Sequence, residues 1–204
     1  MTRKKGMITR EEAFQQVKSM ITRAALIHWA FTKTLVKELG EKKGKALAKK
    51  AIKLYGKEVG KRVKDRTLAK SLPLTRENFQ DDLPDLGWAE REKVQVEGEN
   101  RSRVYTCLLA RVWQELGVPE LGRIYCFVDQ AKYEAYNPEL QCVHVKNVLD
   151  GDAYCELAVR TKKKQRAESV EHRVNRKRKK QKTREKEQKR KNNILSQRPQ
   201  GTQS

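Results

Sequence analysis

The sequence predicts an α+β domain followed by a basic tail, and three observations support this. Two long segments near the N-terminus repeat apolar residues every three to four positions, which is the spacing of amphipathic helices. Later segments alternate apolar and polar residues on either side of turn residues, which is typical of half-buried strands. The composition then changes abruptly near residue 160. Helices that precede a small antiparallel sheet, with further helices packed on it, make up the α+β class.

The first two helices are expected at residues 10–38, closed by Gly40, and at about residues 42–67. Gly56 and Gly60 lie one turn apart on the second helix. Because glycine has no side chain, this spacing favours close packing of another helix. The prolines and glycine that follow mark a connection with at most a short helical turn.

The rest of the domain is expected to form a sheet and two further helices. The alternating pattern around Gly98 predicts a β-hairpin. A short helix should end at Gly117, and another should begin near Pro119 and continue through "RIYCFVDQAKYEAY". The segments "ELQCVHVKNV" and "AYCELAVR" predict two strands that are joined by a turn at residues 150–152.

More than half of the charge of the 204-residue chain lies in its last fifth. The formal net charge is +21, and residues 161–204 contain 17 lysines and arginines against 4 acidic residues. This segment has too few apolar residues to offset the entropy of ordering, so we expect it to be disordered or a lone helix. We therefore predict one domain over residues 1–160 and a tail over residues 161–204. The tail could bind polyanions such as nucleic acid through counterion release, or only keep the chain soluble.

The sequence indicates a cytoplasmic protein. No run approaches the roughly 18–20 apolar residues of a membrane span, and the basic N-terminus lacks the apolar stretch and cleavage site of a signal peptide. In the cytoplasm, cysteines are expected to be reduced thiols rather than disulfides. The chain has four of them, Cys107, Cys126, Cys142 and Cys155.

The soft and titratable groups between residues 123 and 160 are candidates for a site. Helical spacing places Cys126, Asp129 and Tyr133 on one face, while strand spacing places Cys142 and His144 on one face. If this helix packs on this hairpin, a thiol, a carboxylate and an imidazole would meet in one pocket.

Structural explanations compete with this interpretation. Free cysteines are often buried only because they fill space, Asp129 could be an exposed carboxylate, and His144 could be a hydrogen-bonded strand histidine. A zinc site is not favoured, because there is no Cys-x-x-Cys pair and the gaps between cysteines are 19, 16 and 13 residues. We therefore expect neither a metal nor another cofactor.

Several linked motifs resemble a known family. They are a cysteine that opens a short helix (Cys107), Tyr-Cys-x-x-Asp at residues 125–129, Asn-Pro at residues 137–138 and Gly-Asp-x-x-Cys at residues 151–155. Together with "AIKLYGKEVGKRVKDR", they resemble the L-2-amino-thiazoline-4-carboxylic acid hydrolase family over about residues 15–160. One departure is Leu108, where the cysteine of the family is commonly followed by proline.

The resemblance implies a hydrolase of C–N and C–S bonds in a cyclic amidine, typified by opening a 2-aminothiazoline ring to N-carbamoyl-cysteine. The catalytic candidates are Cys126, Asp129, His144 and Cys155. The candidates for substrate binding are Cys107, Tyr125, Tyr133, Asn137 and Asp152. The chain also looks similar to binding domains of the vinyl-reductase type, so a noncatalytic small-molecule sensor is the alternative.

Two mechanisms are consistent with these residues. In the first, a thiolate of Cys126 or Cys155 attacks the ring carbon, Asp129 pairs with the amidine, and His144 acts as the base. A free thiol titrates near ~8.5, so this route needs a neighbour that lowers its pKa. In the second, His144 or Asp129 activates water directly, and the cysteines only line the pocket.

Overall fold

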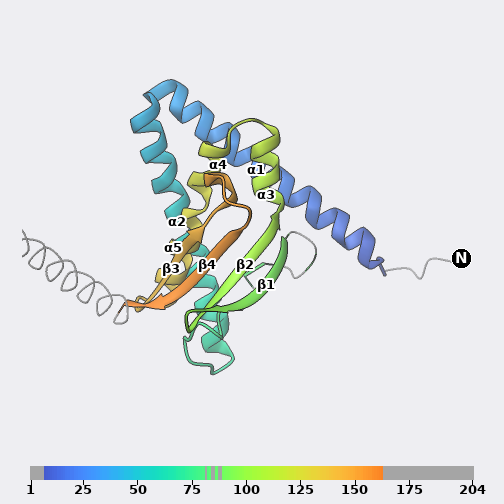
Figure 1. Ribbon diagram of the computed structural model, residues 1–204, viewed down its shortest axis with the longest axis vertical. Helices are drawn as coiled ribbons and strands as arrows, with labels where there is room; N and C mark the ends of the chain where they lie inside the picture. The colour runs from blue at the N-terminus through green and yellow to red at the C-terminus, as the bar shows by residue number, and fades with distance from the viewer. Residues whose placement is uncertain (1–6, 81, 84–85, 87–88, 163–204) are drawn as a thin grey trace, which may run out of the picture. The chain divides into compact units, whose positions relative to one another are not determined.

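The computed structural model describes residues 7–80, 82–83, 86 and 89–162 (Figure 1). The elements follow in the order α1 (Arg10–Leu39), α2 (Glu41–Ala69), β1 (Ala89–Val96), β2 (Glu99–Cys107), α3 (Leu108–Glu115), α4 (Pro119–Tyr125), α5 (Phe127–Tyr136), β3 (Leu140–Lys146), the 3₁₀ turn η1 (Val148–Asp150) and β4 (Cys155–Thr161). The strands form one antiparallel sheet in the order β1-β2-β4-β3. The predicted α+β class is confirmed. The prediction for the tail falls on residues that lie, beyond Lys162, outside the described part of the chain.

Local signals in the sequence explain where the long helices begin and end. Thr9 starts α1 with a capping box, in which its side chain accepts the Glu12 N–H and the Glu12 carboxylate accepts the Thr9 N–H. Gly40 separates α1 from α2 with φ of 77°, a backbone conformation that favours glycine. The two predicted helices are confirmed to within a few residues at each end.

The glycine pair on α2 sets the position of α5. A Cβ atom on Gly56 would lie 2.8 Å from the Cβ of Ala131, and a Cβ on Gly60 would collide with the backbone carbonyl of Lys132. The expected close packing at these glycines is therefore confirmed. It presses α5, which carries Asp129 and Lys132, directly against α2.

The prediction of a single helix after Pro119 was wrong, because the chain forms two helices that meet at Cys126. The N–H of Cys126 bonds to the Arg123 carbonyl, and the Asp129 N–H bonds to the Cys126 carbonyl, so the junction is a tight 3₁₀-like turn. The physical reason is that the two halves share α2 but otherwise pack on different partners. Helix α4 also lies against α1 and α3, where Gly122 leaves room for the Trp113 ring, while α5 packs mainly on α2 and also on β3.

Both predicted turns between strands are present. Gly98 has φ of 72° in the β1–β2 hairpin, and Gly151 has φ of 97° between β3 and β4. The register pairs His144 with Leu157 and Cys142 with Val159. These residues therefore lie on one face of the sheet.

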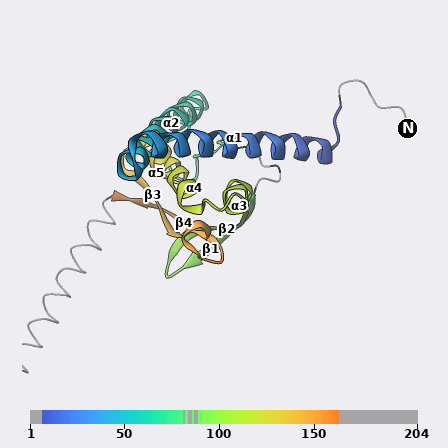
Figure 2. The same ribbon diagram turned by 90° about the horizontal axis from the view of Figure 1, so that it is seen from above.

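The helices cover one face of the sheet (Figure 2), with α3, α4 and α5 between the α1–α2 hairpin and the strands. A buried cluster around Trp113 joins α1 to α3, and a second cluster contains Val63, Tyr136 and Leu140. On the opposite face of the sheet, the buried Glu156 carboxylate accepts hydrogen bonds from Arg101 and Arg103. Within the described residues, no helix is both long and apolar enough to cross a bilayer.

Candidate functional site

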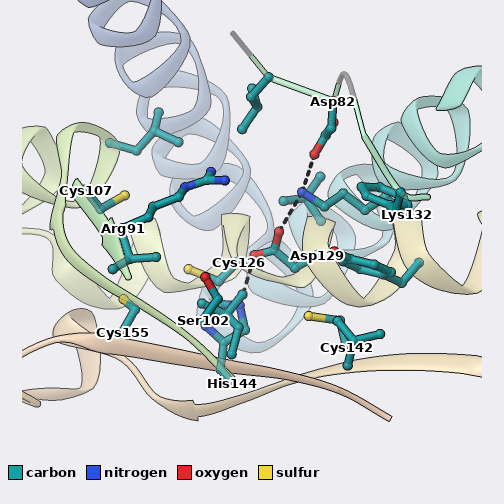
Figure 3. A pocket seen from close by; sticks show the side chains of 18 of the residues that line it. Asp82, Arg91, Ser102, Cys107, Cys126, Asp129, Lys132, Cys142, His144 and Cys155 are labelled. Carbon is teal, nitrogen blue, oxygen red and sulfur yellow. Dashed lines mark hydrogen bonds and ion pairs between the residues drawn. The ribbon is translucent and has the colours of Figure 1, made fainter. Parts of the chain in front are cut away.

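A cavity of about 1350 Å³ lies between the helix-covered face of the sheet, the helices α1, α2 and α5, and the segment before β1 (Figure 3). Its lining brings together residues from distant parts of the sequence, including all four cysteines, Asp129, Lys132, Tyr133, His144 and Asn147. The four catalytic candidates that the sequence suggests, Cys126, Asp129, His144 and Cys155, therefore share one cavity.

A buried set of charges forms one wall of the cavity. The Lys132 ammonium lies 2.9 Å from Oδ1 of Asp129 and 2.5 Å from Oδ2 of Asp82, and these side chains are 11–20% exposed. Burial alone would raise the pKa of Asp129, but the Lys132 charge and a hydrogen bond from His144 hold that pKa well below its usual range. Burial would likewise lower the pKa of Lys132, but the two carboxylates raise it above its usual range. The ions therefore stay charged although they are buried.

The imidazole of His144 lies between Asp129 and Asn147. Its Nε2 atom is 3.0 Å from Oδ2 of Asp129, and its Nδ1 atom is 2.9 Å from Nδ2 of Asn147. The Oδ1 atom of Asn147 accepts the Leu149 N–H at 2.9 Å, which leaves the amide group of Asn147 to donate. Nδ1 of His144 therefore accepts, and the ring proton lies on Nε2, where it is donated to Asp129.

The same amide of Asn147 connects the imidazole to a thiol. Nδ2 of Asn147 lies 3.5 Å from Sγ of Cys126, so its two hydrogens are directed to His144 and Cys126. A hydrogen-bonded series of carboxylate, imidazole, amide and thiol thus runs along the cavity wall from Asp129 to Cys126.

No cysteine has an activated thiol in this structure. Burial raises the pKa of Cys126 to about 12, although the hydrogen bond from Asn147 partly offsets it. Burial also raises the pKa of Cys155, where the Val148 N–H acts in the opposite direction, and the pKa values of Cys107 and Cys142. Among the described residues, no hydrogen bond joins His144 to a sulfur atom. Asn147 and Arg123 both act to lower the pKa of Cys126, but they do not offset its burial, and the imidazole does not contact a thiol directly.

Comparison with known proteins identifies the family. The model of the L-2-amino-thiazoline-4-carboxylic acid hydrolase family matches residues 9–159. The chain belongs to this family. The resemblance seen in the sequence is thereby confirmed, and the family is named for a hydrolase.

No curated protein matches the chain. A solved structure of a trafficking protein particle complex subunit 3 from Naegleria fowleri, covalently bound to palmitic acid, is similar with 16% identity and a TM-score of 0.46. The similarity covers 71% of this chain and 96% of that chain.

Among the candidates for substrate binding in this family member, the two tyrosines and Cys107 line the cavity. The ring of Tyr133 stacks on Phe79 at 4.1 Å, and the ring of Tyr125 meets that of His28 edge-on at 5.3 Å. Burial raises the pKa of both phenols, so they act as neutral walls with polar tips.

The other two candidates for substrate binding do not line the cavity. Asn137 donates to the Leu74 carbonyl at 2.7 Å and accepts the Glu139 N–H, so it holds the turn before β3. Asp152 accepts the backbone N–H of Asn147 at 2.7 Å. It therefore positions the residue that bridges His144 and Cys126.

Several cavity residues were not anticipated from the sequence, among them Lys132, Asn147 and Arg91. Lys132 lies three residues after Asp129, and this helical spacing could have predicted the ion pair. Asn147 looks like an ordinary turn residue in the sequence, and Arg91 is one of many basic residues. Figure 3 shows the Arg91 side chain reaching into the cavity from β1. Within the described part of the chain, no three His, Cys, Asp or Glu side chains form a metal-binding group.

Proposed function

We propose that this protein is a hydrolase that opens a small cyclic amidine or amide, such as 2-aminothiazoline-4-carboxylate, to an N-carbamoyl amino acid. The observation that carries the proposal is the series from Asp129 through His144 and Asn147 to Cys126, which lines a cavity able to admit a ligand. Membership of the family supports the class of reaction.

The reaction needs a nucleophile for the ring carbon between sulfur and nitrogen, and a group that accepts and returns a proton. In the proposed mechanism, Sγ of Cys126 attacks this carbon while its proton moves to Nδ1 of His144. The imidazolium that forms is stabilised by Asp129, which lies 3.0 Å from Nε2. The bond between the ring carbon and the ring sulfur then breaks, and the substrate sulfur takes the proton from His144.

The second half of the reaction returns the enzyme to its starting form. Water attacks the carbon of the Cys126-bound isothiourea and gives a proton to Nδ1 of His144. The bond between that carbon and Cys126 breaks, the cysteine sulfur recovers the proton from His144, the second proton of the water moves to the former ring nitrogen, and N-carbamoyl-cysteine leaves. Overall, one water is consumed for each ring that is opened.

This mechanism places a clear demand on Asn147, because its amide occupies Nδ1 of His144. Substrate must draw that amide away, so that the thiol proton can reach the imidazole. Because the pKa of Cys126 is high, little thiolate forms before substrate binds. The thiol must therefore lose its proton as it attacks the ring carbon. A substrate carboxylate would be held by the guanidinium of Arg91, which reaches into the same cavity.

A second candidate is a noncatalytic binding domain. The observation that favours it is that every cysteine has a raised pKa and both ring nitrogens of His144 already have partners. Such a site would hold a ligand without reacting with it.

Release of thiol from 2-aminothiazoline-4-carboxylate tests the proposal. The intact protein should turn the substrate over, and Cys126→Ser should reduce the rate by about 10²-fold or more. Cys142→Ser is the matched control, because Cys142 lines the cavity but is not in the hydrogen-bonded series. Full turnover by both Cys126→Ser and Cys155→Ser would exclude the covalent route in favour of water activated by His144 or Asp129. Ligand-dependent melting without turnover would establish a binding domain instead.

A further inference from the structure

We infer that the natural ligand of this cavity carries a flexible apolar arm beside its polar ring, so that it is larger than 2-aminothiazoline-4-carboxylate. The identity of the polar ring rests on the proposed function, but the apolar arm is argued separately. The cavity volume of about 1350 Å³ exceeds the roughly 300–1,000 Å³ of pockets that hold drug-sized ligands. A single ring with one carboxylate would leave most of this space to water.

The polar and apolar parts of the lining come from different elements. Asp129 and Lys132 are on α5, His144 is on β3, and Asn147 follows it. This part of the wall would hold the polar ring.

Helix α1 contributes a mainly apolar wall instead. Its lining residues are Gln16, Val17, Met20, Ile21 and Ala24. Val17, Ile21 and Ala24 follow each other at intervals of four and three residues, so they form one stripe along the helix. Tyr55 and Val59 of α2 and Val104 of β2 add further apolar surface.

The free energy of hydration explains why this wall calls for an apolar ligand group. A ligand bound only at Asp129 and His144 would leave the stripe of α1 in contact with water. An aliphatic arm that covers the stripe would remove apolar surface from water on both molecules. We therefore expect each buried methylene of the arm to tighten binding about threefold to fourfold.

The test measures binding of 2-alkylamino-thiazoline-4-carboxylates of increasing chain length to the full-length protein by calorimetry. Affinity should rise with each methylene until the alkyl chain fills the apolar part of the cavity. Ala24→Phe should abolish this rise and leave the affinity for the unsubstituted ring unchanged, because the added ring fills the apolar part of the cavity. Ala30→Phe is the matched control, since Ala30 is exposed on the same helix and does not line the cavity.

Val17→Phe is a second variant for the same wall, to be used if Ala24→Phe does not melt cooperatively. An affinity that is independent of chain length would overturn the inference, and so would a rise that persists in both filled variants. If the unsubstituted ring is nevertheless hydrolysed, the proposed function survives that failure. If affinity rises as expected but no thiol is released, the apolar arm is supported and the proposed hydrolysis fails.

Discussion

The side-chain amide nitrogen of Asn147 lies 2.9 Å from Nδ1 of His144, and this contact determines which ring nitrogen carries the proton. The amide cannot turn over without losing the hydrogen bond between its oxygen and the Leu149 N–H. It is also almost fully buried, with 1% exposure. A turn residue after β3 thus controls the tautomer of the imidazole that faces the cavity.

Replacing Asn147 by Asp should change the protonation of His144. The carboxylate would still accept the Leu149 N–H, but its second oxygen would face Nδ1 as an acceptor instead of a donor. We expect a proton on both ring nitrogens in the variant and on Nε2 alone in the unmodified protein. Imidazole ¹⁵N chemical shifts distinguish the two, and identical spectra would show that Asn147 does not set the tautomer.

Asp129 should make the free energy of unfolding decrease as the pH falls into the acidic range. Its pKa is lowered in the fold, so its contribution is complete above its unfolded pKa near ~3.9 and is lost as pH falls further. Asp129→Asn should cost about 2 kcal/mol in the free energy of unfolding at neutral pH. The variant should also lose less stability than the unmodified protein between pH 5 and pH 2, as measured by urea unfolding. Glu115→Gln, at the exposed end of α3, is the matched control.

The Cys126 thiol should react slowly with iodoacetamide at neutral pH. With a pKa of about 12, its thiolate fraction rises about tenfold per pH unit up to that value. The alkylation rate of Cys126, followed by peptide mass spectrometry, should therefore keep rising beyond pH 10. A plateau near pH 8 would mean that a neighbouring group already activates the thiol.

Gly60→Ala should destabilise the domain by about 1–3 kcal/mol, because the new methyl group would collide with the Lys132 carbonyl. The sign of the change is decisive. If α2 and α5 were not in close contact, alanine would instead stabilise the helix by about 1 kcal/mol. Thermal or urea unfolding of the purified variant measures the difference.

Polyanion binding should involve α2 as well as the tail. This helix has 11 lysines and arginines against 3 acidic residues, so its net charge of +8 equals that of residues 1–160 as a whole. We expect the triple substitution Lys50→Glu, Lys57→Glu and Lys61→Glu, all at exposed positions, to lower the salt concentration that elutes the full-length chain from heparin. Replacement of three lysines of the tail by glutamate, at residues 177, 179 and 180, is the matched control. Unchanged elution of the α2 variant would assign binding to the tail alone.

The sequence by itself determined the elements and the sides that their residues face. The side chains of a helix repeat every 3.6 residues and those of a strand every 2 residues, and both repeats can be read from residues that are near in sequence. They predicted the two long helices, the hairpin around Gly98 and the shared face of Cys142 and His144 without knowledge of the fold. The same local rules placed Cys126 and Asp129 together, although they missed the break between α4 and α5.

Only the tertiary structure decided the electrostatics of the candidate site. Lys132 meets Asp82 across 50 residues of sequence, and the depth at which Cys126 is buried raises its pKa instead of activating the thiol. Burial and hydrogen-bond partners come from segments that are distant in the chain, so no short pattern encodes them. The sequence therefore names the thiols, the carboxylate and the imidazole that reach the cavity, whereas packing adds their partners and decides which groups hold their protons.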